Sequence, residues 1–193
     1  MLKSAFIVAA LSAVAALPAL GGVSPHETIS ATIGGNTVKI TYGRPFSKKP
    51  GTDVVRPIWG GLVKWDKADR LGADQATTLV LQKGIVIGGL TVPAGTYTLY
   101  IVPSEKGTSK LAISKKTGQW GIPVQEDADL GRVDLKKTDL DKQLDQLTLS
   151  VAAEGAGGVI KIQWEKTQYS VDFTNASWVA SCCSGTACRG TSV

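Results

Sequence analysis

The most constraining feature of this sequence is a two-residue alternation of apolar and polar side chains that recurs along the chain. It is clear in residues 38–42, which read VKITY. A period of two is that of a strand with one buried face, whereas a helix would repeat about every 3.6 residues. Together with the turn residues that separate its segments, the alternation predicts ten strands, at residues 28–33, 37–42, 77–82, 85–87, 96–102, 110–114, 132–136, 144–153, 159–165 and 169–174.

The strands predict an all-β fold, an antiparallel β-sandwich or a barrel-like domain. Turn signals such as Gly34-Gly35-Asn36 and Pro93-Ala94-Gly95 suit hairpins, and no stretch between the strands resembles the crossover helix of a parallel sheet. We expect short helical turns at most, of which residues 139–146 could form one or two. Two long loops remain, at residues 43–75 and 115–131. Loops of that length on a rigid sheet are where function is usually found.

The length and the ends of the chain predict three segments. A chain of 193 residues suits one domain with a real core. Residues 1–22 resemble a signal peptide, with Lys3 before an apolar run and small residues at the cleavage site. We therefore expect a signal peptide at 1–22, a single β-sandwich domain at 23–175 and a flexible tail at 176–193. The protein should be exported, to the periplasm or the exterior, with no stable membrane insertion after cleavage.

All three cysteines lie in the tail, at Cys182, Cys183 and Cys188. In an exported chain, Cys188 could pair with either neighbour and leave one thiol for an intermolecular disulfide. The alternative is a soft-metal site formed by three thiolates, but no histidine lies nearby to complete it. The domain itself contains no cysteine, so a disulfide plays no part in its core.

The composition excludes several classes of chemistry and partner. His26 is the only histidine, and it follows the predicted cleavage site, so neither a Ser-His-Asp triad nor a histidine metal site is expected. The pairs Asp127/Asp129 and Asp139/Asp141 lack the glycine and distal glutamate of a calcium loop. The net charge is +5, but the basic residues are scattered, which argues against nucleic acid. We predict no catalytic residue, no metal and no cofactor.

One constellation of polar and aromatic side chains remains as a candidate site. Acidic, basic and amide groups crowd the end of the first long loop, Tyr42 and Arg44 stand at its start, and Trp120 lies in the second loop. If the loops meet at one rim, these groups suit a polar ligand, through stacking on tryptophan and bidentate contacts from arginine. The candidate ligand-binding residues are Tyr42, Arg44, Arg70, Asp74, Gln75 and Trp120. The alternative is a structural network, in which Arg44 and Arg70 pair with Asp74 and loop carbonyls to hold the long loop down.

Several of these residues lie in motifs that resemble the bacterial family called domain of unknown function 2911. The motifs are Tyr42-Gly43-Arg44-Pro45, Trp59-Gly60-Gly61-Leu62-Val63, residues 70–77 (RLGADQAT) and Pro93-Ala94-Gly95-Thr96-Tyr97, followed by Gln119-Trp120-Gly121 and Trp164-Glu165. The resemblance covers nearly all of residues 24–173. It implies an exported β-rich domain and assigns no activity.

Three hypotheses for the function follow. The first, which we favour, is a non-catalytic binding or interaction module that uses the loop rim to bind a polar ligand or an envelope protein. The second is a hydrolase of glycan or another cell-envelope substrate, with Asp74 and either Asp69 or Asp66 as a carboxylate pair. The third is an assembly role, through an exposed edge strand or the cysteine tail.

Overall fold

The computed structural model describes residues 24–176 of the chain. These residues form eleven strands and one short 3₁₀ turn, η1. The elements are β1 (His26–Ile33), β2 (Asn36–Gly43), β3 (Asp69–Arg70), β4 (Thr77–Leu81), β5 (Ile85–Ile87), β6 (Leu90–Val92), β7 (Gly95–Val102), β8 (Lys110–Ser114), η1 (Glu126–Ala128), β9 (Asp129–Asp134), β10 (Lys136–Glu154) and β11 (Gly157–Asn175). The predicted signal peptide and the cysteines Cys182, Cys183 and Cys188 lie outside the described residues.

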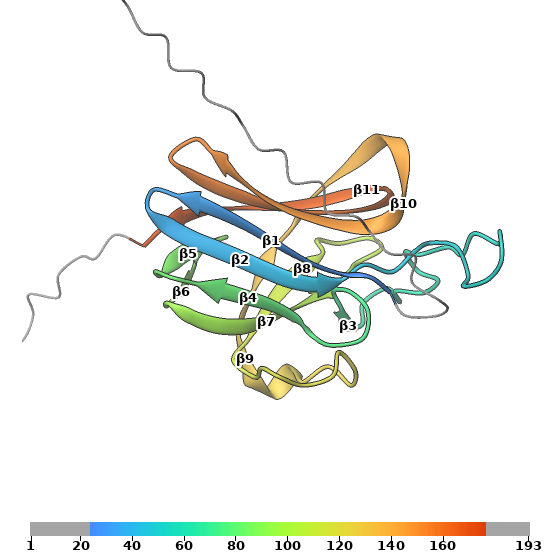
Figure 1. Cartoon of the computed structure of the whole chain (residues 1–193), viewed down its shortest axis with the longest axis horizontal. Coiled ribbons are helices and arrows are strands. Elements are labelled where there is room, and N and C mark those ends of the chain that lie inside the picture. Colours follow the sequence, from blue (N-terminus) through green and yellow to red (C-terminus); the bar gives the residue numbers. More distant parts are fainter. Residues whose placement is uncertain (1–23, 177–193) are drawn as a thin grey trace, which may run out of the picture.

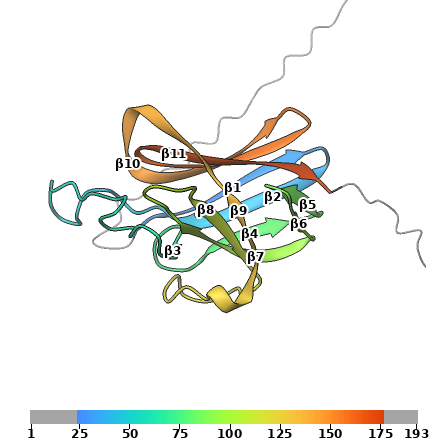
Figure 2. The same ribbon diagram turned by 180° about the vertical axis from the view of Figure 1, so that it is seen from behind.

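The strands form two antiparallel sheets that face each other (Figure 1). The larger sheet has the order β1-β2-β4-β7-β8-β9, with β3 paired to β7, and the smaller has the order β10-β11-β5-β6. Figure 2 shows the same two layers from behind. The all-β sandwich expected from the sequence is therefore confirmed, with the helical content limited to η1.

The core consists of the apolar residues of the alternating pattern. In β2, Val38 and Ile40 have no exposed surface, while Lys39 between them is exposed. Ile160 and Ile162 of β11 are buried in the same way from the opposite sheet. Each such side chain removed from water contributes roughly 1.5–3 kcal/mol to folding, so this face holds the two sheets together.

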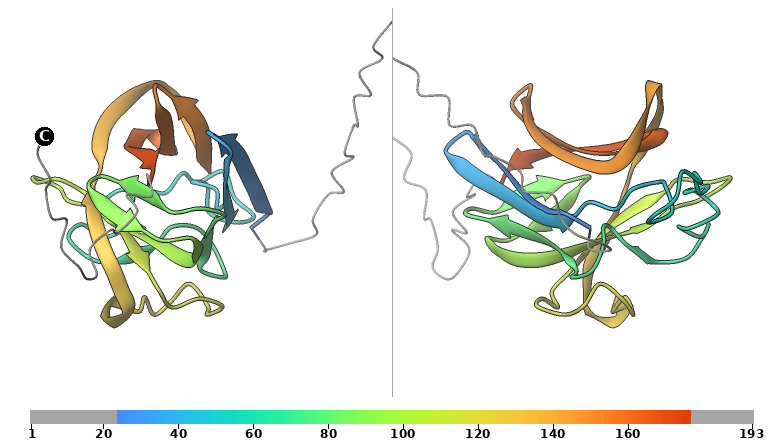
Figure 3. Two further views of the ribbon diagram at one scale, coloured as in Figure 1. Left: turned by 90° about the vertical axis from the view of Figure 1, so that its left-hand side faces the viewer. Right: turned by 45° about the vertical axis from the view of Figure 1, so that its right-hand side comes forward.

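The prediction of helical turns at residues 139–146 is wrong. These residues belong to β10, which pairs with β11 from Lys136 opposite Ser170 onward. Leu140, Leu144 and Leu147 follow a helix-like spacing among charged residues, which explains the error. Hydrogen bonding to a neighbouring strand outweighs such a weak local preference. The register shifts twice, between Asp139 and Leu144 and between Leu144 and Thr148, and Figure 3 shows the resulting curved hairpin of β10 and β11.

Other differences concern the limits of strands. The predicted strands 159–165 and 169–174 are one continuous strand, β11, in which Glu165 has a φ of +52° where the register of the hairpin shifts. β9 begins and ends earlier than the predicted strand 132–136. β3 was not predicted, because two residues are too few to show an alternating pattern. β6 was not predicted either, because it is a short segment between two turn sequences, Gly88-Gly89 and Pro93-Ala94-Gly95.

The two long loops lie where the sequence placed them. The first connects β2 to β4 and contains β3, and the second connects β8 to β9 through η1. Most of the first loop projects beyond the end of the sheets, opposite the end at which β11 finishes (Figure 1). Within residues 24–176, no helix is long and apolar enough to cross a membrane.

Candidate functional site

The two long loops meet, as the binding hypothesis required. The Ala76 amide donates to the Gln119 carbonyl over 3.2 Å, and the Gly121 amide donates to the Asp74 carbonyl over 2.9 Å. Gly121 is needed for this approach, since a Cβ atom there would lie 2.5 Å from Cδ of Arg70 and 2.9 Å from the Asp74 oxygen. Backbone bonds therefore fix the second loop against the end of the first.

A groove of about 770 Å³ lies beside this junction. Its volume is in the range of small-molecule sites in proteins. Most of its wall comes from the first loop, with Ile122 from the second loop and Trp164 from β11. The lining residues are Ser24, Pro25, Pro45, Phe46, Lys48, Pro50, Gly51, Arg56, Leu62, Val63, Asp69, Arg70, Gly72, Ala73, Asp74, Ile122 and Trp164.

The groove is amphipathic. Proline and large apolar side chains such as Phe46, Leu62 and Ile122 cover much of its wall, and each of these three is between 43% and 52% exposed. Three cationic side chains, Lys48, Arg56 and Arg70, and two carboxylates share the same lining. The arrangement suits a ligand with both an apolar surface and charged groups, rather than the purely polar ligand expected from the sequence.

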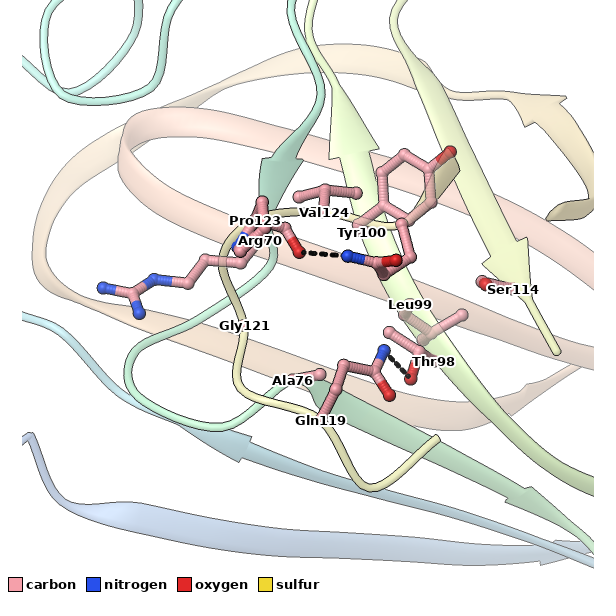
Figure 4. Close-up of a pocket in the computed structure, with 11 residues that line it drawn as sticks. Arg70, Ala76, Thr98, Leu99, Tyr100, Ser114, Gln119, Gly121, Pro123 and Val124 are labelled. Atoms are coloured by element: carbon pink, nitrogen blue, oxygen red, sulfur yellow. Dashed lines mark hydrogen bonds between the residues drawn. The ribbon is translucent and has the colours of Figure 1, made fainter. Parts of the chain in front are cut away.

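Arg70 is the candidate residue whose charge is most available to a ligand. It lies on β3, opposite Tyr100 of β7. Its Nη1 donates to the Asp74 carbonyl at 3.3 Å, and no carboxylate among residues 24–176 lies within 4.0 Å of its guanidinium nitrogens. In Figure 4 the guanidinium extends away from Thr98 and Gln119. A cation without a carboxylate partner in a groove is suited to an anionic group.

Arg70 also borders a second, much smaller cavity. This cavity has a volume of about 10 Å³, enough for about one water molecule. Gln119 lies against it and donates to the Thr98 hydroxyl over 3.2 Å, as Figure 4 shows. The small cavity is too small for a ligand, and we assign the candidate site to the groove.

Asp74 lies in the groove and contacts the histidine that sequence reasoning set aside. Its Oδ2 is 3.2 Å from Nε2 of His26, the first residue of β1. Gly43 faces His26 in the sheet and packs against Ala73, where a Cβ on Gly43 would lie 2.3 Å from the Ala73 oxygen. This close approach brings the turn that contains Asp74 to the start of β1. The sequence predicts that the first strand begins at residue 28. The strand begins two residues earlier, at His26, and this extension places His26 opposite Gly43.

Asp69, which the sequence suggested only as a member of a carboxylate pair, was not among the six candidate ligand-binding residues. It lines the groove, and burial raises the pKa of its carboxyl to about 6, although the neighbouring Arg70 lowers it. Asp66 is exposed and outside the groove lining, where its carboxylate accepts a hydrogen bond from Ser104 Oγ at 2.7 Å. Of the three acids considered for a carboxylate pair, Asp69 and Asp74 share the groove and Asp66 does not.

Tyr42 and Arg44 lie outside the groove lining and join the two sheets. The Tyr42 hydroxyl donates to Glu27 Oε2 and accepts from the Leu149 amide, each at 2.9 Å. Burial is the main reason that the pKa of Tyr42 rises to about 12. Arg44 donates to the Leu147 carbonyl at 3.1 Å, and its Nε lies 3.2 Å from Glu27 Oε2. These contacts match the structural network, with Glu27 as the carboxylate in place of Asp74.

Gln75 and Trp120 form the junction between the loops. They face each other in an isolated antiparallel bridge, and neither lines the groove. Trp120 is 54% exposed. Of the six candidate ligand-binding residues, only Arg70 and Asp74 line the groove.

Aromatic side chains form the base of the first loop. Trp59 packs edge-on against Tyr169, with ring centroids 5.0 Å apart, and against Trp164 at 6.5 Å. Trp164 is 4% exposed and belongs to the core, where it follows the buried Ile160 and Ile162 at every second position of β11. Trp59 therefore anchors the first loop to β11, and this anchor positions the groove.

The described part of the chain offers no metal centre. Within residues 24–176, no three His, Cys, Asp or Glu side chains gather closely enough to hold a metal ion. The sequence indicates a disulfide for the tail cysteines, with a metal site as the alternative. These cysteines lie outside the described residues.

Comparison with known proteins identifies the family. The family model described as a protein of unknown function, DUF2911, matches residues 24–173, so the chain belongs to this family. This confirms the resemblance that the motifs indicate. No curated protein and no solved structure matches the chain.

Proposed function

We propose that this DUF2911 protein is an exported, non-catalytic binding module whose ligand occupies the groove beside the loop junction. The observation that carries the proposal is Arg70, a cation in the groove wall that has no carboxylate partner within residues 24–176. The predicted signal peptide supports a periplasmic or extracellular location. Fractionation of the producing cells tests that location, since a protein retained in the cytoplasm would contradict it.

The lining of the groove supports one class of ligand. An anionic group, a carboxylate or phosphate, would accept hydrogen bonds from Arg70. An apolar portion of the same ligand would cover Phe46, Leu62 and Ile122, which are now partly exposed to water. We therefore propose an amphipathic, anionic ligand of the cell envelope, such as a peptide or an acidic glycan fragment.

Chemical-shift mapping of the protein tests where such ligands bind. The probes are acidic peptides and uronic-acid oligosaccharides, each added to isotopically labelled protein. Shifts concentrated at Asp69, Arg70 and Ile122 would support the proposal. Shifts concentrated on the outer face of β4 or β7, away from the loops, would contradict it.

A hydrolase is the second candidate, and one observation favours it. Asp69 and Asp74 both line the groove, and burial raises the pKa of Asp69 to about 6, which suits a general acid. Its substrate would be a glycan or another envelope polymer. Release of reducing ends from cell-wall polysaccharide by the wild type, and its loss in Asp69→Asn, would establish this function. The absence of any release, together with ligand binding, would leave the binding module.

A further inference from the structure

The first long loop concentrates the positive charge of the protein. We call residues 44–67 the basic loop. Its charged residues are Arg44, Lys48, Lys49, Asp53, Arg56, Lys64, Asp66 and Lys67, six cations and two carboxylates with a net charge of +4. Of the 21 lysines and arginines of the chain, only Lys3 and Arg189 lie outside residues 24–176. Residues 24–176 therefore contain nineteen cations and all sixteen carboxylates, which gives a net charge of +3. Outside the basic loop, the described chain therefore has a net charge of −1.

The exposed apolar side chains are found in the same region. Six large hydrophobic residues within residues 24–176 are exposed, and all six lie in the two long loops. The basic loop contains four of them, Phe46, Val54, Val55 and Leu62, and the second loop contributes Trp120 and Ile122. Val54 and Val55 are 60% and 48% exposed. Exposed apolar side chains that gather in one region mark an interaction site.

The tip of the basic loop is an ordered hairpin. Lys48 pairs with Val55, and the Lys49 amide donates to the Val54 carbonyl over 2.8 Å. Arg56 closes its base, since Nη2 donates to the Phe46 carbonyl over 2.7 Å. The hairpin projects past the end of both sheets (Figures 1 and 2). The two valines are therefore held away from the core by backbone structure.

Several lysines of the basic loop are free to contact an external surface. Arg44 is paired with Glu27, and Lys48 lies 3.5 Å from Asp53. Lys49, Lys64 and Lys67 are exposed, and none of them lies within 4.0 Å of a carboxylate oxygen in the part of the chain described. Of these three lysines, Lys49 lies beside an exposed valine, since its amide donates to the Val54 carbonyl.

We propose that the basic loop docks the protein reversibly on an anionic lipid surface. Such a surface supplies phosphates for the lysines and, just below them, an apolar layer for Val54 and Val55. Docking is peripheral, because only a hairpin tip enters the interface. The proposal does not require a ligand in the groove, although the basic loop also contributes eight residues to the groove lining, among them Phe46, Lys48 and Arg56.

Sedimentation with lipid vesicles tests this proposal. Residues 24–193 are used, because they contain both sheets and the whole described core but lack the apolar segment 1–22. The probes are vesicles of phosphatidylcholine alone and vesicles in which about a third of the lipid is phosphatidylglycerol, a fraction that supplies the negative surface potential. We expect binding to the anionic vesicles only, and loss of most of it in 0.5 M salt, where the Debye length falls to roughly 4 Å.

Two double variants separate the roles of charge and apolar contact. Lys48→Gln with Lys49→Gln should weaken binding by about tenfold or more. Val54→Ser with Val55→Ser preserves the charge and should weaken binding by about fivefold. The control, Lys136→Gln with Lys137→Gln, removes the same charge from exposed positions on β10 and should change binding by less than about twofold.

Several results would overturn the proposal. These are equal binding to neutral vesicles, full binding in 0.5 M salt, an equal loss in the β10 control, or unchanged binding in either double variant of the basic loop. No binding to anionic vesicles would also overturn it, and an acidic protein surface would then be the partner to seek.

Discussion

Nε2 of His26 lies 3.2 Å from Oδ2 of Asp74, although the two residues are 48 positions apart in the chain. The contact connects the start of β1 to the turn that borders the groove. Both side chains are partly exposed, at 35% and 28%. The pair thus marks where the N-terminal strand meets the candidate site.

The His26–Asp74 pair should contribute little to stability. Because solvent screens an exposed pair, the coupling energy from a double-mutant cycle with His26→Ala and Asp74→Ala should be below about 1 kcal/mol. Urea unfolding of the wild type and the three variants measures it. A coupling of about 3 kcal/mol would show that the pair is a structural clamp.

Tyr42→Phe should be clearly destabilising. The hydroxyl of Tyr42 accepts a hydrogen bond from the buried Leu149 amide, so its removal should cost about 1–3 kcal/mol of unfolding free energy. Thermal and urea unfolding would detect the change. Tyr97→Phe is the matched control, because its hydroxyl donates to the Pro93 carbonyl at the edge of a turn. A larger loss in the control than in Tyr42→Phe would refute the role given to Tyr42.

Gly43→Ala should be destabilising, since the new Cβ would lie 2.3 Å from the backbone oxygen of Ala73. The turn before β4 would have to move, at a cost of roughly 1–3 kcal/mol. In Gly107→Ala the nearest atom is Oγ of Ser104 at 3.2 Å, and the effect should be small. Equal melting temperatures for wild type and Gly43→Ala would show that the turn is not tightly held against β2.

The raised pKa of Asp69 predicts how the stability of the protein depends on pH. Its folded pKa, about 6, is above its ordinary value of 3.8, so the folded protein binds more protons than the unfolded chain between these values. The contribution of Asp69 to the free energy of unfolding therefore falls as the pH rises from about 4 to 6 and its carboxyl ionises in a partly buried position. At pH 7 the ionised carboxylate still destabilises the fold. Asp69→Asn should remove it and stabilise the protein at pH 7 by about 1 kcal/mol, a figure reduced by solvent screening of this partly exposed group.

Urea unfolding at pH 4 and pH 7 tests this effect. The stabilisation by Asp69→Asn should be present at pH 7 and largely absent at pH 4. Asp172→Asn removes a carboxylate from an exposed position on β11 and should not reproduce this difference. A stabilisation by Asp69→Asn that is the same at both pH values would show that ionisation of Asp69 is not its cause.

The sequence predicted the fold better than it predicted the site. Alternation located the core strands because burial on one face of a sheet leaves a local pattern, as Val38 and Ile40 show. The exposed half of β10 has no such pattern. Pairing with β11 holds Leu144 opposite Glu165 in a strand, and residues 139–146 alone do not show that contact.

The roles of the site residues depended on contacts between distant parts of the chain. Tyr42 and Leu149 are 107 positions apart, so no local signal marked Tyr42 as a link between the sheets. Arg70 and Asp74 were identified because they stand close together in one loop that the fold places beside the groove.

The most direct test of the proposed function is calorimetric titration of wild type and Arg70→Gln with acidic peptides and uronic-acid oligosaccharides. A charge-assisted hydrogen bond contributes roughly 1.5–3 kcal/mol, so a ligand that binds the wild type should bind Arg70→Gln about ten to a hundredfold more weakly. The melting temperature should change little, since Arg70 makes one long hydrogen bond, to the Asp74 carbonyl. Equal affinity of both proteins for every ligand that binds, or no binding by the wild type, would contradict the account.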